Sequence, residues 1–140
     1  IGSAKIRLED PYIRLPYQMN LLLEFCSMLM NTKNDDEEIE LHVVTWNEPD
    51  EMINESTENL DEITETVFDM GIKLTYEFNP NTHDRFIQSD KLNQAFSSPY
   101  IIPLEGLIAD GIINFDNFTE NERNILDSFF NSLTEQLSNN

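Results

Sequence analysis

The chain has 140 residues, of which 8 are Lys or Arg and 27 are Asp or Glu, so its formal net charge at pH 7 is −19. This length fits one domain with a single core. A hydrophobic content of 39% with 10% aromatic residues excludes a wholly disordered chain. The negative charge repels nucleic acid and anionic lipid at long range, so we expect neither nucleic acid nor a membrane as the partner.

The single cysteine, Cys26, excludes an internal disulfide, and its apolar neighbours predict a buried thiol rather than a nucleophile. The chain opens without a basic segment followed by an apolar run, and no window approaches the ~18 apolar residues of a membrane span. We therefore expect a cytoplasmic protein. Because the first residue is Ile1 and not Met, we expect the domain to be part of a longer polypeptide.

Short alternating runs and longer apolar runs follow one another in the first half of the chain. Residues 4–8 alternate in polarity, which predicts a strand, and Pro16 suits the first turn of a helix that runs to about Met30. This helix is apolar on nearly every face, so we expect a sheet to cover one side and a partner subunit another. Residues 39–46 are rich in β-branched side chains and predict a second strand.

A second helix begins at Pro49, with apolar residues at helical spacing as far as Met70, and its other faces are acidic. We therefore expect a surface helix with one apolar stripe, which ends at Gly71. Residues 72–78 alternate cleanly and predict a half-buried strand, and a fourth strand is expected near residues 84–88. This order predicts an α/β fold with a mainly parallel sheet flanked by helices.

The last third of the chain is less regular. Between Leu92 and Asp116 only residues 100–102 and 111–113 are candidate short strands. A final helix is expected from Thr119, with a capping box to Glu122. Its apolar face comprises Ile125, Leu126, Phe129, Phe130, Leu133 and Leu137. We interpret residues 1–140 as one domain, in which 91–140 is an atypical C-terminal extension, and we expect the apolar helix faces to form a homodimer or larger assembly.

The segment from Thr82 to Asp90 carries the most informative chemical pattern, His83-x-Arg85-x4-Asp90. It differs by one residue from the His-x-Lys-x4-Asp signature of the phospholipase D superfamily, which arranges an imidazole nucleophile, a phosphate-binding cation and a carboxylate around one phosphodiester. Arginine and lysine are not interchangeable at such a site. On the residues alone, hydrogen bonding of a loop is the favoured role for this segment, and catalysis by His83, Arg85 and Asp90 is the alternative.

Other residues offer weaker signals. Arg7, Arg14 and Arg85 could form a small anion site at the ends of the strands, where open α/β sheets bind ligands, or could simply offset an acidic surface. His42 lies in the middle of a predicted strand, and a histidine with satisfied hydrogen bonds that faces a helix or lies at a sheet edge is favoured over a second catalytic imidazole. The spacing of His42 and His83 is not that of metal ligands, so we expect neither a metal nor a cofactor.

A set of motifs in the chain is similar to one known family. The segments 9–14 (Glu-Asp-Pro-Tyr-Ile-Arg) and 82–85 (Thr-His-Asp-Arg), together with Gln18 and the helix that contains Phe25 and Cys26, resemble the phospholipase D-like C-terminal domain of MIT-domain-containing proteins and its prokaryotic relatives. The resemblance extends over roughly residues 4–90. It implies a phospholipase D-like α/β fold, a tendency to dimerise, and binding rather than catalysis.

One departure from the family pattern bears on function. The glycine-rich segment expected after the signature is absent, because the chain continues directly from Asp90 into Lys91-Leu92-Asn93-Gln94. We therefore favour a non-catalytic interaction or oligomerisation module within a larger cytosolic protein, which binds a protein partner or a phosphate-containing ligand. The alternative is a phosphodiesterase or nuclease in which each subunit of a dimer contributes His83 to one composite site.

Overall fold

The computed structural model describes residues 3–11, 13, 16–46, 53–81, 86–98, 101–103 and 120–138. Five strands form one sheet: β1 (Ser3–Glu9), β2 (Glu38–Thr45), β3 (Ile72–Phe78), β4 (Phe86–Ser89) and β5 (Ile101–Pro103). Four helices accompany them: α1 (Pro16–Met30), α2 (Ile53–Phe68), α3 (Asp90–Ala95) and α4 (Glu120–Ser138). The strands and the two long helices of the first half therefore lie where the sequence predicts them, and only the short helix α3 was not anticipated.

The sheet has the strand order β3-β2-β1-β4-β5. The first three predicted strands are adjacent and parallel, as expected, with Ile6 opposite Leu41 and Leu41 opposite Leu74. β4 runs antiparallel to β1, and β5 runs antiparallel to β4. The sheet is thus mixed, and the prediction of a mainly parallel sheet is only partly right. Two β–α–β crossovers make the parallel half, whereas β4 and β5 join it without a long covering helix between them.

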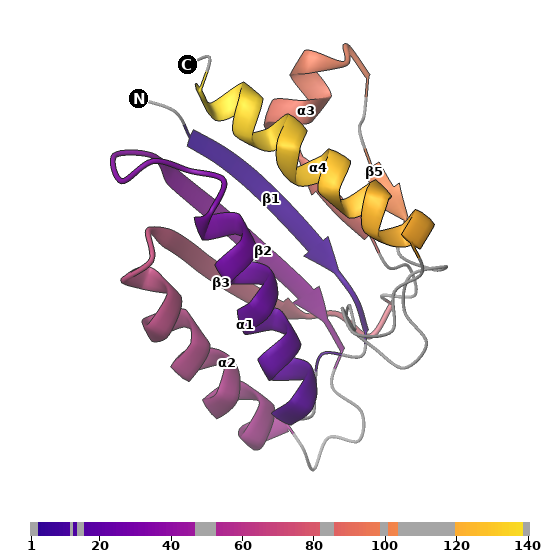
Figure 1. Cartoon of the computed structure of the whole chain (residues 1–140). Coiled ribbons are helices and arrows are strands. Elements are labelled where there is room, and N and C mark those ends of the chain that lie inside the picture. Colours follow the sequence, from indigo (N-terminus) through magenta and orange to yellow (C-terminus); the bar gives the residue numbers. More distant parts are fainter. Residues whose placement is uncertain are drawn as a thin grey trace.

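The long helices α1, α2 and α4 all lie on the same side of the sheet (Figure 1). Both crossovers advance in the same direction across the sheet, from β1 to β2 and from β2 to β3. Because such crossovers are right-handed, their helices must cover the same face. The expectation of helices against the sheet is therefore confirmed, and the described long helices all lie on one of its two faces.

The hydrophobic core lies between the sheet and this helical layer. Alternate strand residues such as Ile6, Leu8 and Leu41 are at most 2% exposed and join one cluster with side chains of every described helix. The C-terminal helix belongs to it, because the Phe25 ring on α1 and the Phe130 ring on α4 are 5.9 Å apart between centroids. The apolar stripe of α4 is thus covered by the chain itself, with Leu126, Phe129, Phe130, Leu133 and Leu137 buried.

Gly71 makes the tight connection between α2 and β3. Its φ is +82°, a conformation that L side chains rarely adopt. A Cβ at this position would also meet the end of the Lys33 side chain at 2.5 Å. The prediction that Gly71 ends the second helix is therefore confirmed.

Candidate functional site

The candidate residues from the sequence divide into two groups. Arg7 and Asp90 belong to the described residues, whereas Arg14, His83 and Arg85 lie outside them. The residue that follows Arg85 in the chain, Phe86, pairs with Glu9 at the end of β1. The beginning of β4 is therefore at the carboxyl end of β1, the edge of the sheet where ligands bind in many α/β folds.

Asp90 lies at the opposite end of β4. Ser89 pairs with Ile6, and Asp90 follows it as the first residue of α3. Its Oδ1 accepts hydrogen bonds from the backbone N–H of Lys5 at 2.7 Å and of Lys91 at 2.8 Å. Asp90 comes four positions after Phe86, which corresponds to a distance of roughly 13 Å along an extended strand. This carboxylate fastens α3 to β1 at that end of the sheet.

Arg7 lies on the face of the sheet opposite the helices. Its Nε donates to Glu9 Oε2 at 3.3 Å, and its side chain is 43% exposed. The strand register places it in one row with Gln88, His42 and Thr75, across β4, β1, β2 and β3. Side chains in register on neighbouring strands are close enough to act on one ligand. Arg7 therefore belongs to a surface in the middle of the sheet.

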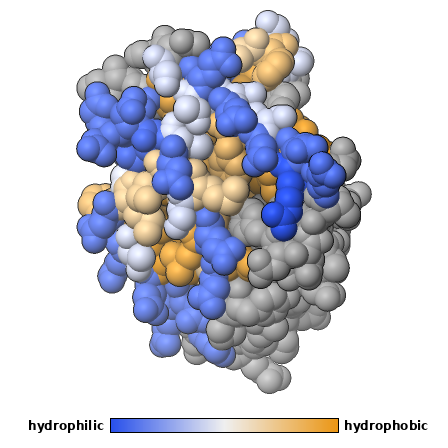
Figure 2. Space-filling model, viewed as in Figure 1, coloured by the Kyte–Doolittle hydropathy of each residue, from blue (hydrophilic) through white to orange (hydrophobic). Residues whose placement is uncertain are grey.

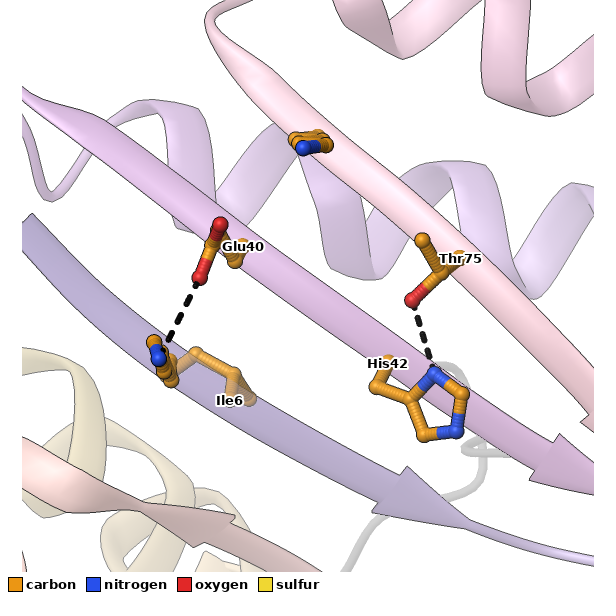
Figure 3. A pocket seen from close by; sticks show the side chains of 6 residues that line it. Ile6, Glu40, His42 and Thr75 are labelled. Carbon is orange, nitrogen blue, oxygen red and sulfur yellow. Dashed lines mark hydrogen bonds and ion pairs between the residues drawn. The ribbon is translucent and has the colours of Figure 1, made fainter.

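His42 has hydrogen-bond partners, as expected, but its place in the sheet differs from the expectation. It faces neither a helix nor a sheet edge: it projects from β2, which lies between β3 and β1, and its side chain is 36% exposed (Figure 3). Its Nδ1 is 2.7 Å from Thr75 Oγ1, and its Nε2 is 2.9 Å from Glu77 Oε1. The signal was present in the alternation of β2, in which Ile39, Leu41 and Val43 are buried and the residues between them are polar.

Two adjacent hollows occupy this face. One, of about 310 Å³, is lined by Lys5, Ile6, Arg7, His42, Gln88, Asp90 and Asn93. The other, of about 200 Å³, is lined by Lys5, Ile6, Glu40, His42, Lys73 and Thr75 and is drawn in Figure 3. Because they share Lys5 and His42, we call them together the open-face trough.

The open-face trough gathers positive charge on a very acidic chain. Six of the eight Lys and Arg residues are described, and three of these six, Lys5, Arg7 and Lys73, line it. Within the described part of the chain, the side chains of Lys73 and Gln88 make no hydrogen bond or ion pair. The trough therefore has hydrogen-bond donors that no other described residue engages.

Cys26 takes no part in this surface. It is fully buried in the core, as predicted, and burial raises the pKa of its thiol from 9.0 to about 12. A thiol that stays protonated at neutral pH is a poor nucleophile. Within the described residues, no helix combines the length and the apolar character that a membrane span requires.

Residues 2–94 match the family described as the phospholipase D-like domain at the C-terminus of MIT. The chain belongs to this family. The resemblance drawn from its motifs is thereby confirmed, and the match takes in the strands β1–β4 and most of α3. The helix α4 lies outside the matched residues, although it completes the hydrophobic core of this phospholipase D-like domain.

Proposed function

We propose that this phospholipase D-like domain is a non-catalytic interaction and oligomerisation module of a larger protein. The observation that carries the proposal is the position of Asp90, whose carboxylate is engaged by two backbone N–H groups at the far end of β4 from Phe86. A phosphodiesterase of this superfamily needs the three parts of the signature around one phosphate. The presence of Arg85 where the signature has lysine supports the same conclusion.

The helical layer offers a surface for a protein partner. Apolar side chains gather across it and are bordered by hydrophilic ones (Figure 2). Four residues of α1 are only partly buried against the core, namely Leu21, Leu23, Met28 and Met30. Phe68, at the end of α2, is 70% exposed. Apolar surface rimmed by polar residues is typical of protein interaction sites.

The charge of α2 indicates the chemistry of that partner. Its exposed residues include Glu55, Glu58, Asp61, Glu62 and Glu65. A partner surface that combines apolar side chains with Lys or Arg would complement both the apolar patch and its acidic border. A second copy of the chain can satisfy the apolar part, so sedimentation of the purified domain tests the homodimer directly. The apolar face of α4 is buried in the core of the same chain and is not open to a second copy. Of the two apolar helix faces expected to form the dimer, the one on α1 therefore still supports it, together with the neighbouring surface of α2.

The test of catalysis uses two variants of the signature. We expect the wild-type domain to hydrolyse neither a generic phosphodiester nor lipid, nucleotide or single-stranded DNA substrates, and His83→Ala to leave folding and partner binding unchanged. Arg85→Lys restores the superfamily signature and should remain inactive, because Asp90 stays engaged at the other end of β4. Hydrolysis by the wild type that His83→Ala abolishes would overturn the proposal and establish the dimeric phosphodiesterase instead.

A further inference from the structure

The open-face trough is a candidate binding site that the interaction surface on the helices does not include. The two surfaces lie on opposite sides of the molecule, with the sheet between them (Figures 1 and 3). We infer that the larger hollow of the trough binds a compact phosphate monoester, through Arg7, Lys5 and Gln88. This inference is independent of whether the helical layer binds a protein.

The donors of the larger hollow suit an oxyanion. Among the described residues, Arg7 bonds only through its Nε, toward Glu9, so its two terminal guanidinium nitrogens can donate to a ligand. Such a planar fork matches phosphate geometry with two parallel hydrogen bonds. Gln88, opposite Arg7 in the register, adds an amide, and the Lys5 side chain, 77% exposed, adds a mobile ammonium group. A doubly charged phosphate thus meets two cations and a neutral donor.

The carboxylates around the hollow are already engaged. Asp90 accepts two backbone N–H groups, Glu9 accepts from Arg7, and Glu77 contacts His42. Glu40 is 4.0 Å from Lys5 and lines only the smaller hollow. A ligand held by Arg7 and Gln88 therefore displaces no ion pair among the described residues, and Lys5 would exchange only its long contact with Glu40. The charged residues that line the larger hollow, Lys5, Arg7 and Asp90, sum to +1, against −19 for the whole chain.

The same chemistry could come from a soluble phosphomonoester or from a lipid headgroup. The net charge favours the soluble source, because a bilayer of anionic lipid would face the field of the entire acidic chain, whereas a small ligand meets mainly the local cations. His42 lines the larger hollow, and its Nδ1 is hydrogen-bonded to Thr75, so its imidazole resonances can report the binding of the ligand.

The experiment titrates the full chain with inorganic phosphate and follows backbone and His42 imidazole resonances by NMR, with sodium chloride at matched ionic strength as the blank. Saturable shifts confined to the trough are expected. Arg7→Met should weaken binding by about tenfold or more, the usual effect of losing a charge-assisted pair. Arg123→Met, which removes an exposed charge of α4 outside the trough, should leave the affinity unchanged. Glu40→Gln should strengthen binding, because it removes a neighbouring negative charge.

A second arm uses vesicles of phosphatidylcholine with phosphatidic acid. No cosedimentation is expected. Vesicle binding that Arg7→Met abolishes, without binding of free phosphate, would keep the site but assign it to a lipid headgroup. Absence of saturable shifts with phosphate and of vesicle binding, or equal loss in Arg7→Met and Arg123→Met, would overturn the inference. Because all three substituted positions are at least partly exposed, retained folding is expected, and the spectra themselves check it.

Discussion

The two faces of the sheet are built from alternate residues of the same strands, yet they have opposite characters. On β2, Ile39, Leu41 and Val43 are fully buried under the helices, whereas the side chains of Glu40 and His42 are 44% and 36% exposed. On β1 the same alternation buries Ile6 and Leu8 and exposes Lys5. Each strand therefore contributes apolar side chains to the core on one face and polar, exposed side chains on the other, because successive side chains point to opposite sides.

The difference between the faces follows from topology. Helices that connect parallel strands in one direction must cover one face, and that face collects the apolar residues. On the other face, none of the described long helices packs against the strands. Charged and polar side chains such as Lys5, Arg7, His42 and Lys73 can therefore lie there at little cost in stability. A substitution should accordingly have a large effect on the free energy of unfolding on the helical side and a small one in the trough.

The largest expected effect is at α4, the helix outside the family match. Phe129→Ala should lower the free energy of unfolding by about 3–5 kcal/mol, because it removes a fully buried ring from the core. Ile125→Ala, on the same helix but 41% exposed, should cost less than about 1 kcal/mol. Urea unfolding followed by circular dichroism measures both. Equal small effects would show that α4 is not part of the covered face in solution.

Substitutions at two neighbouring residues of β2, one on each face of the sheet, compare the two faces directly. Leu41→Ala should cost about 2–5 kcal/mol, since it leaves a cavity beneath the helices. His42→Ala removes two hydrogen bonds at a partly exposed position and should cost about 1 kcal/mol or less. The same urea titrations give both values. A loss at His42 as large as that at Leu41 would mean that the open face is covered in solution, by a partner or a second copy.

The reactivity of Cys26 measures how well the core beneath the helices is protected from solvent. Its thiol should react with a disulfide reagent at pH 8 only after unfolding, because burial raises its pKa from 9.0 to about 12. The raised pKa also means that its contribution to stability is complete below pH 9 and is lost as the pH rises toward 12. Cys26→Ala should therefore show a shallower fall in stability over that range. Rapid labelling of the native protein would contradict this closed core.

The sequence was sufficient to predict the elements that form the covered face, but not which residues come together on the open face. Helical and alternating periodicity located α1, α2, β2 and β3, because burial on one side imposes that periodicity. It could not show that β4 turns back along β1, since direction is set by pairing rather than by local residues. For the same reason the sequence did not indicate the row of Arg7, His42 and Thr75, which only the strand register brings together.

The smallest effect concerns a polar contact at the rim of the covered face. The Tyr76 hydroxyl donates to Asp61 Oδ1 at 2.6 Å, which links β3 to the acidic helix α2. Burial, followed by the hydrogen bond and negative charge of Asp61, raises the pKa of Tyr76 from 10.0 to about 12. Its contribution to stability is therefore present below pH 10 and is lost as the pH rises toward 12.

Asp61→Asn should bring the pKa of Tyr76 down toward 10 and leave the stability at pH 7 changed by less than about 1 kcal/mol, as expected for an exposed pair. Absorbance at alkaline pH follows the ionisation, with one of four tyrosines shifting. Glu65→Gln removes one charge from the same helix without touching Tyr76 and should leave the titration as it is in the wild type. Superimposable curves for wild type and Asp61→Asn would show that this contact does not persist in solution. The boundary between the covered face and solvent would then lie deeper, at Val67 and Leu74.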